Sequence, residues 1–491
     1  MTTTDALATT RGWKPWYGLW GFLMVGWTVS AADRALTGPV MTWMIDNKVS
    51  FIAEAENPHA LAGLVGGLFF AGYMLTQFPG GYLGDRYGHR TLILVSLFWA
   101  GIATILTGLF AGLLMFVALR VITGLGEGAY YSNDRSVIAE VTPERQRSTG
   151  MGVVITGLAI GITIAVVGTP YMVEVGAALL SGAEAWRMPF WILGTATLLA
   201  AAACWLRFRK DEEELQVGKA TVHLLGYSAV SFFAVMAVYM LATQAGIGEL
   251  WTAVVEVALA LVLVLFALTR KGEELRPVLK HRDLFLLYLA GIPILWNLWF
   301  FSFWSVAIVG EAANSSFLEA ALVAGFNAGA GILGFPVGGW LSDLGMRRGW
   351  GRKPMLLSFT AAQALITFGF AYYQSTTGPN VWTMAALLFF ASLFFNALQP
   401  IWHALAADIA EPSQRGSAFG MMNLISEIGA VLSPAVSGVM RDATGAWTSA
   451  LYLDAALVVA GLVLFALVRE MRGAGTGAAM HGAVPAAARD R

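Results

Sequence analysis

The sequence has 491 residues, of which 57% are hydrophobic and 12% are charged, and its formal net charge is -1. Soluble proteins carry about 25% charged residues, so this composition predicts an integral membrane protein and argues against a nucleic-acid partner. The single cysteine, Cys204, excludes an internal disulfide and a metal cluster held by thiolates.

Apolar segments long enough to cross a bilayer run through the whole chain. A transmembrane helix needs about 20 apolar residues, and about fourteen segments meet this length. The first is expected to be retained, because the N-terminus lacks the compact apolar stretch and the small-residue cleavage site of a secretory signal peptide. We therefore predict an all-α integral membrane protein. The predicted helices cover residues 16–44, 60–82, 91–111, 114–138, 148–172, 187–206, 222–243, 249–268, 283–309, 316–341, 354–373, 380–406, 416–438 and 446–468.

Charge alternates between the predicted loops. Much of the lysine and arginine lies in "DRYGHR", "RFRKDEEE", "TRKGEELRPVLKHR" and "MRRGWGRK". The alternate loops, such as "DNKVSFIAEAENPH" and "YQSTTGPN", hold almost none. Because short basic loops stay on the cytoplasmic side, both termini are predicted to be cytoplasmic, in a multi-pass protein of the inner (plasma) membrane.

Two loop sequences occur twice, in the same order. "GGYLGDRYGHR" resembles "GGWLSDLGMRRGWGRK", and "VTPERQRSTGMG" resembles "IAEPSQRGSAFG", with copies about 260 to 270 residues apart. This repeat indicates two homologous halves of six helices. The predicted domains are a cytoplasmic N-terminus (1–15), an N-terminal six-helix bundle (16–206), a central linker (207–282) that contains an extra hairpin (222–268), a C-terminal six-helix bundle (283–468) and a disordered cytoplasmic tail (469–491).

The first of these loops resembles the signature loop of the major facilitator superfamily, which has this order of glycine, aspartate, arginine, glycine and a basic residue. The resemblance implies two bundles that rock around a site near the middle of the membrane, with the loop acting as a conformational latch. In the second copy Leu344 replaces the first arginine and the spacing is longer. The expected latch residues are Gly81, Asp85, Arg86, Arg90 and Asp343.

Two full charges, Asp33 and Arg34, stand side by side in the first predicted helix. Trp16 and Trp43 are 27 residues apart, which is about 40 Å along a helix and close to the thickness of a bilayer with its headgroups. If both tryptophans lie at the interfaces, the charged pair is inside the membrane, where each charge costs about 2.5 to 3.5 kcal/mol unless it is paired or hydrated. The alternative, favoured by Pro39, is that the helix ends near Ser30 and the pair lies in a solvated loop.

The fourth predicted helix carries the complementary charges. Arg120 and Glu127 are seven residues apart, so they share one helix face but differ by about 10 Å in height, and each needs a partner on another helix. With Asp33 and Arg34 they form a neutral group of four. Protonation of either acid would leave an arginine unpaired and favour an anion, which couples anion binding to proton binding. The alternative is a static network that only holds the helices together.

These four residues are similar to those of the anion:cation symporter family, which includes bacterial sugar-acid transporters. The resemblance implies that Arg34 and Arg120 bind the substrate carboxylate, and that Asp33 and Glu127 carry protons. Vesicular members of the family have an arginine in the first helix of the second half. This sequence has no arginine there and has Asn297 instead. Further candidates are Trp296, Asn396 and Gln399 for the substrate and Glu427 as a second proton site. Asn396 could equally contact another helix, and a structural or secondary role is favoured for Glu427.

The predicted function is proton-coupled symport of a small organic anion, a carboxylate such as a sugar acid or an aromatic acid, by alternating access. The expected partners are the anion, the proton and the lipid bilayer, the protein is expected to be a monomer, and the driving force is the proton gradient without a cofactor. No catalytic or phosphate-binding motif was found, so we do not expect an enzyme.

Two alternatives stay open. One is a fourteen-helix drug:proton antiporter, although the fifth helix lacks that group's Gly-Pro-x-x-Gly-Gly run, and the other is a transporter-like nutrient sensor.

Overall fold

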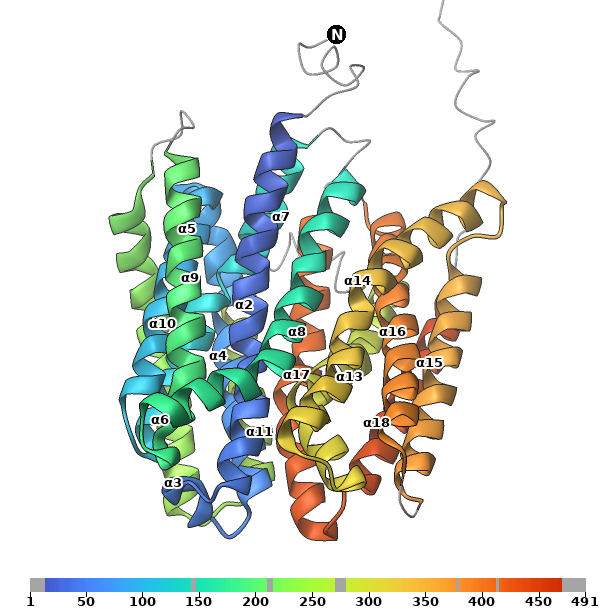
Figure 1. Cartoon of the computed structure of the whole chain (residues 1–491). Helices are drawn as coiled ribbons and strands as arrows, with labels where there is room; N and C mark the ends of the chain where they lie inside the picture. Colours follow the sequence, from blue (N-terminus) through green and yellow to red (C-terminus); the bar gives the residue numbers. More distant parts are fainter. Residues whose placement is uncertain are drawn as a thin grey trace, which may run out of the picture.

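The computed structural model describes residues 14–142, 147–209, 215–269, 280–376, 379–411 and 415–469, and long helices lie side by side through it (Figure 1). Each of the fourteen predicted segments is helical. The elements are α2 (Pro15–Asp46), α3 (Ser50–Ala53), α4 (Pro58–Tyr87), α5 (His89–Leu109), α6 (Leu113–Glu127), α7 (Tyr130–Val141), α8 (Arg147–Leu179), a short 3-10 turn η2 (Gly182–Glu184), α9 (Arg187–Phe208), α10 (Val217–Gln244), α11 (Glu249–Thr269), α13 (Arg282–Ala313), α14 (Phe317–Arg347), α15 (Lys353–Gln374), α16 (Val381–Ile409), α17 (Arg415–Thr444) and α18 (Thr448–Leu467).

Within the described residues, twelve helices are long and apolar enough to cross a membrane. The two other predicted spans, α2 and α11, are helices of 32 and 21 residues that fall outside this count. The all-α, multi-pass membrane class is therefore confirmed, with slightly fewer qualifying spans than the fourteen predicted. The predicted N-terminus and tail lie almost wholly outside the described residues.

The first helix continues through its charges. α2 is unbroken from Pro15 to Asp46 and contains Pro39. Its 32 residues extend about 48 Å. Asp33 is 1% exposed and Arg34 is 5% exposed. The alternative of a helix that ends near Ser30, with a solvated charged loop, is therefore wrong.

The fourth predicted helix is divided in two. α6 ends at Glu127 and α7 begins at Tyr130, so Gly128 and Ala129 separate them. A side chain at Gly128 would overlap the Tyr73 carbonyl oxygen and the Thr76 hydroxyl of α4. Glycine here permits this close approach to α4, and the break places Glu127 at the end of α6. Gly128 and Ala129 keep helical backbone angles, so Leu113–Ile138 still forms one membrane span and the predicted span over 114–138 is confirmed, with a two-residue turn inside it.

The helices form two groups, which we call the N-half (α2–α9) and the C-half (α13–α18) (Figure 1). They meet mainly where α4 packs on α17 and α8 packs on α14, and α2 also contacts α13. We call the end of the bundle where α2 begins and α18 ends the terminal face, at the top of Figure 1, and the other end the opposite face.

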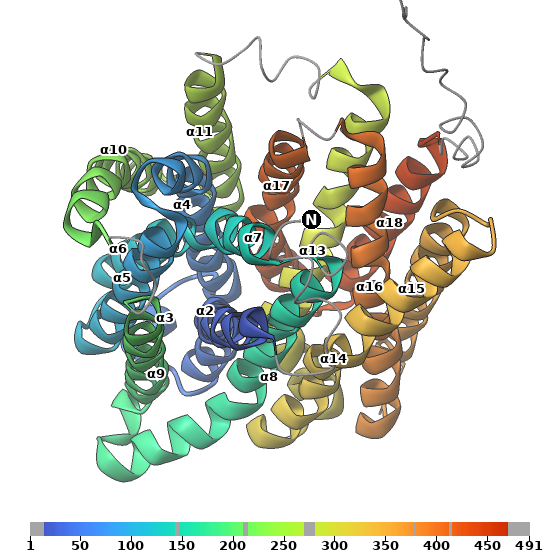
Figure 2. The same cartoon turned by 90° about the horizontal axis from the view of Figure 1, so that it is seen from above.

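The hairpin of α10 and α11 lies at the edge of the bundle (Figure 2). α10 packs on α4 and α5, whereas α11 contacts α4 of the N-half and α17 of the C-half. Glu256 of α11 is 1% exposed, and neither of its carboxylate oxygens has a hydrogen-bond partner in the described part of the chain. The hairpin thus covers one of the two main seams between the halves.

Candidate functional site

The first ion pair of the site joins α2 to the end of α6. Arg34 donates from Nε to Glu127 Oε2 at 2.7 Å, and from its two other nitrogens to Tyr73 Oη at 3.0 Å and Ser30 Oγ at 2.9 Å. Ser30 in turn donates to Glu127 Oε2 at 2.9 Å. The guanidinium lies over the rings of Tyr73 and Trp27, at 4.3 and 5.1 Å from their centroids. Glu127 Oε1 has no hydrogen-bond partner among the described residues.

The second ion pair lies beside the first. Both terminal nitrogens of Arg120 lie 3.4 Å from Asp33 Oδ1, while Thr104 donates to Asp33 Oδ2 at 2.6 Å. Arg120 also donates to Thr37 at 3.3 Å and Thr123 at 3.1 Å, and it is 0% exposed. Rings from two further helices, Phe69 of α4 and Phe190 of α9, flank its guanidinium.

The two pairs together form the neutral group of four that the sequence predicts. Arg120 and Glu127 do not pair with each other. Each pairs instead with one of the two adjacent charges on α2, Asp33 and Arg34. Charges buried in a low-dielectric interior are tolerated only when paired and hydrogen-bonded. Loss of one member by protonation therefore leaves its partner as an uncompensated charge.

Sequence reasoning missed the residues that complete these pairs. Ser30 precedes Arg34 by four residues on one helix face, so its contact could have been predicted from spacing. Tyr73 and Thr104 come from α4 and α5, and nothing in a single sequence says which of many tyrosines and threonines faces α2. Asp134, which accepts a hydrogen bond from Trp27 at 2.6 Å, continues the polar contacts of α2 toward the terminal face.

Glu427 lies at the seam between the halves. Gln77 of α4 donates to Glu427 Oε1 at 3.4 Å, and Asn423 of α17 donates to Gln77 Oε1 at 2.8 Å. The other Glu427 oxygen has no partner among the described residues. This predicted proton site therefore takes part in a polar contact between the two halves, and its charge also acts on Arg34 of the group of four.

A small pocket of about 20 Å³ lies where α8 faces the C-half. Two predicted substrate residues, Asn297 of α13 and Asn396 of α16, line it together with three residues that were not predicted, Ser302, Asn327 and Ser392. The remaining walls are largely apolar and include Leu158, Ala159 and Ile162 of α8 and Leu298, Ala328, Phe335 and Phe395 of the C-half.

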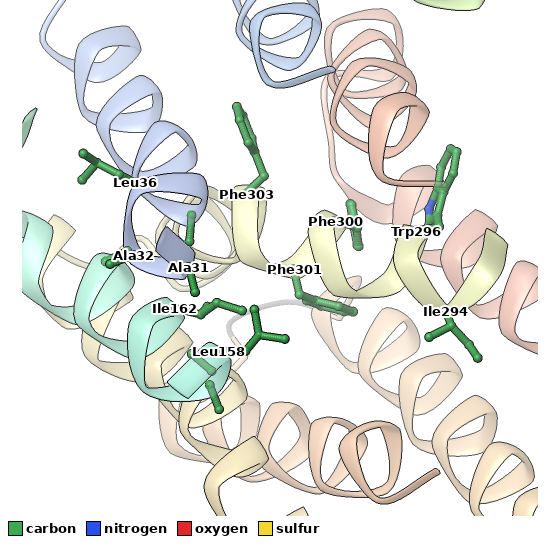
Figure 3. Close-up of a cluster of buried hydrophobic side chains, with 14 of the residues drawn as sticks. Ala31, Ala32, Leu36, Leu158, Ile162, Ile294, Trp296, Phe300, Phe301 and Phe303 are labelled. Carbon is green, nitrogen blue, oxygen red and sulfur yellow. The ribbon is translucent and has the colours of Figure 1, made fainter. Parts of the chain in front are cut away.

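The other predicted substrate residues do not line this cavity. Trp296 turns toward α17 (Figure 3), and its indole nitrogen, like the amide nitrogen of Gln399, has no partner in the described ranges. Arg34 and Arg120 lie in the N-half. A cluster of apolar side chains from α2, α8 and α13 lies at the meeting of these helices, and Ala31, Ala32, Ile162, Phe301 and Phe303 are among those drawn in Figure 3.

Charged residues join the two halves at the opposite face. His59 of α4 lies with Nδ1 2.7 Å from Asp442 Oδ1, and the Ala60 backbone N–H donates to Asp442 Oδ2 at 2.8 Å. Glu311 of α13 lies 3.7 Å from His59 Nε2 and accepts from Arg441 at 2.8 Å. We call these four side chains, His59, Glu311, Arg441 and Asp442, the opposite-face lock.

Aromatic rings and close backbone contact reinforce the lock. The rings of Trp304 and Trp447 lie 5.8 and 5.7 Å from that of His59. A side chain at Gly438 of α17 would overlap the His59 carbonyl, so the helices touch through their backbones there. The halves are therefore closed against each other at the opposite face.

The predicted latch loop closes mainly on its own half. The side chain of Asp85 is 77% exposed and lies 3.5 Å from His89, which also contacts Asn133 of α7 at 2.8 Å. Arg86 lies over the ring of Tyr87. A Cβ atom added at Gly81 would lie 3.3 Å from the Ser132 hydroxyl of α7, which is a slightly tight contact. The side chain of Asp343 is outside the described part of the structure, and the latch role of these residues, with Arg90, stays a prediction.

The chain resembles known transporters over most of its length. A sequence model of the Major Facilitator Superfamily matches residues 23–379 and 346–482. A probable galactarate/D-glucarate transporter of Bacillus subtilis is 23% identical, over 83% of each chain, and a D-galactonate transporter of Escherichia coli is 22% identical, over 82% of this chain and 85% of its own. A probable sulfoacetate transporter of Cupriavidus necator is 26% identical, over 81% and 83%.

Two solved structures have the same fold. A bacterial homologue of the human lysosomal transporter Spinster aligns with a TM-score of 0.64 at 18% identity, over 93% of this chain and 97% of its own. A D-xylose–proton symporter aligns with a TM-score of 0.64 at 15% identity, over 93% and 98%. At these identities the likeness establishes the architecture, and the predicted two-bundle fold is confirmed.

Proposed function

Since the chain belongs to the major facilitator superfamily, we propose that it is a symporter that carries a small organic anion together with a proton by alternating access. The observation that carries the proposal is the pair of buried, mutually neutralising ion pairs between α2 and α6. In this arrangement one proton changes the net charge of the site from zero to positive.

Glu127 is the best-placed proton acceptor. One of its oxygens binds Arg34 and Ser30, and the other has no partner among the described residues. A proton on Glu127 removes the carboxylate that neutralises Arg34. A buried guanidinium without a counter-charge is costly, so the substrate's carboxylate takes the place that Glu127 gives up. Proton and anion therefore bind together and the loaded site is neutral again.

Asp33 and Arg120 have a supporting part in this proposal. Arg120 is 0% exposed and enclosed by Asp33, three threonine hydroxyls and two aromatic rings. That enclosure favours a role in fixing Asp33 and the turn of α2 that carries Arg34. The direct carboxylate ligand is then Arg34 alone, and Arg120 acts through the position of α2.

The substrate class that we propose is a sugar acid. The named substrates of the relatives include galactarate, D-glucarate and D-galactonate, which are hydroxylated carboxylates. This chain offers Arg34 for a carboxylate and, between α8 and the C-half, a pocket with amide and hydroxyl groups from Asn297, Ser302, Asn327, Ser392 and Asn396 for the hydroxylated part. The two sites lie on opposite halves, so a substrate that spans them would link the halves as they rock.

We further propose that the terminal face is cytoplasmic, because the basic loops lie there, and that the opposite face is the outer one. The conformation described here is then closed toward the outside. The opposite-face lock and the aromatic residues around it hold that closure in place.

Replacing His59 with alanine is expected to open the outer side more often. Hydrogen bonds to charged groups contribute about 1.5 to 3 kcal/mol, so access should increase by about tenfold or more. The measurement is the rate at which a membrane-impermeant thiol reagent, added outside, labels a cysteine placed at Ser302 in the cavity. The native Cys204 is buried and gives little background.

His59→Asn is the control, because the asparagine amide nitrogen takes the place of the ring Nδ1 that contacts Asp442. It should label at a rate close to that of the parent. An unchanged labelling rate in His59→Ala would show that the lock does not hold the outer side closed.

The proposed function is tested in proteoliposomes by imposing a pH gradient and following labelled D-galactonate and external pH together. Symport predicts that a low external pH drives accumulation of galactonate. It also predicts that adding galactonate without a pH gradient makes the external medium more alkaline, because protons enter with it. An antiporter would accumulate substrate only with the gradient reversed. A sensor would bind the acid and show no flux in either direction.

A further inference from the structure

At the pocket between α8 and the C-half, the side chain of Asn297 offers a hydrogen-bond acceptor. Asn297 Nδ2 donates to Asp454 Oδ2 of α18 at 2.6 Å. The amide nitrogen is therefore the end of the Asn297 side chain that faces α18. The amide nitrogen and oxygen lie on opposite sides of one planar group. The carbonyl oxygen, Oδ1, is therefore the end of Asn297 left for a ligand.

The side-chain amide of Asn396 is also oriented by hydrogen bonds, in this case to a residue of its own helix. Its Nδ2 donates to the Ser392 backbone carbonyl at 2.8 Å and to the Ser392 hydroxyl at 3.0 Å. A carbonyl only accepts, so the orientation of this amide is fixed too. Its Oδ1 lies against Gly331 of α14, where there is no side chain to cover it. The Ser392 hydroxyl proton is used as well, because it donates to the Asn327 backbone carbonyl at 2.7 Å.

The rest of the lining supplies no positive charge. None of the residues that line the cavity is an arginine, lysine or histidine. Ser302 and the Asn327 side chain can each donate or accept. Behind Asn297, Asp454 is 0% exposed, and its second oxygen has no partner within the described ranges. The cavity therefore combines two fixed acceptors with a buried acid directly behind one of them.

We infer that this cavity selects a substrate whose end distant from the carboxylate carries hydrogen-bond donors, such as hydroxyl groups, and that it rejects a second carboxylate there. The inference rests on the proposed function, because it assigns the far end of the same anion. Asp454 is a positioning residue that holds the Asn297 oxygen toward the substrate. A hydroxyl can donate to both fixed acceptors, whereas a carboxylate has no proton to donate and would be a buried charge without a partner.

D-galactonate and galactarate are the matched probes. They share a carbon chain and differ at one end, where the first has a hydroxymethyl group and the second a carboxylate. Binding is measured on the purified full-length protein by the concentration of each acid that gives a half-maximal thermal shift. The expected result is that galactonate binds at least about tenfold more tightly, because the second carboxylate of galactarate would be a buried charge without a partner.

Asp454→Asn tests the positioning role. Its amide can donate to Asn297 Oδ1, which frees the Asn297 nitrogen to face the cavity as a donor, and it removes the buried acid. The ratio between the affinities for galactonate and galactarate should then decrease severalfold. If Asp454 is merely structural, both affinities fall together and the ratio stays the same.

The comparison of the two acids on the unmodified protein does not depend on whether the variant folds. Equal or tighter binding of galactarate would overturn the inference and leave proton-coupled anion symport intact. If neither acid binds or drives proton movement, the proposed sugar-acid function fails, and the inference fails with it. An unchanged ratio in a folded Asp454→Asn variant would overturn the role of Asp454 alone.

Discussion

Arg34→Ala is expected to lower proton-driven uptake of the substrate anion by at least about 100-fold. The variant loses the guanidinium that we assign to the substrate's carboxylate. It also leaves Glu127, which is 1% exposed, without the partner now 2.7 Å away. Breaking a buried pair by removing one member costs about 3 to 5 kcal/mol, of which 3 kcal/mol corresponds to about 100-fold. The measurement is initial uptake in proteoliposomes under a fixed pH gradient.

Two controls separate loss of the anion site from loss of the fold. Arg34→Lys keeps the charge but cannot reach Glu127, Tyr73 and Ser30 at once, so intermediate uptake is expected. Arg34→Ala combined with Glu127→Gln removes both members of the ion pair and should restore thermal stability without restoring uptake. Wild-type uptake by Arg34→Ala would mean that the carboxylate binds elsewhere.

Glu127→Gln should separate exchange from accumulation. Glutamine resembles the protonated carboxyl group, so Arg34 stays available to the anion while the site can no longer release a proton. Counterflow of labelled against unlabelled substrate should continue, whereas accumulation driven by a pH gradient should fall to the level seen without the gradient. Both are measured in the same proteoliposome preparation.

Glu427→Gln is the matched control for Glu127→Gln. Glu427 is also buried and also has one oxygen without a partner in the described part of the chain, but it hydrogen-bonds to Gln77 at the seam, whereas the ion pair of Arg34 is with Glu127. It should retain gradient-driven accumulation if Glu127 is the coupling site. If Glu127→Gln accumulates substrate normally and Glu427→Gln does not, then Glu427 and not Glu127 is the coupling site.

Much of the fold was predictable because apolar length is a strong local signal. All fourteen segments were found, and the repeated loops identified two halves. The division between α6 and α7 was not predicted, because it depends on how closely Gly128 approaches Tyr73 and Thr76 of another helix. A single glycine inside an apolar segment does not reveal such an approach.

The site was predictable in its charges and not in its pairing. The two charges of α2 and the two of α6, Asp33, Arg34, Arg120 and Glu127, sum to zero, so the neutral group followed from the sequence. The choice of Asp33 for Arg120 and of Arg34 for Glu127 depends on the rotation and height of α2 against α6. The orientation of Asn297 similarly depends on Asp454, 157 residues away, which no local pattern connects to it.

The crossed pairing of Asp33 and Arg34 also limits how this sequence can change over generations. A single replacement at any of the four positions leaves a charge inside the membrane without its ion-pair partner, so single steps lower the stability of the protein. Pairs of replacements, Asp33 with Arg120 or Arg34 with Glu127, keep the balance at each site. We therefore expect surviving variants to lose these residues two at a time. A descendant that lost only Arg34 and Glu127 would keep its helices packed but would no longer bind the anion.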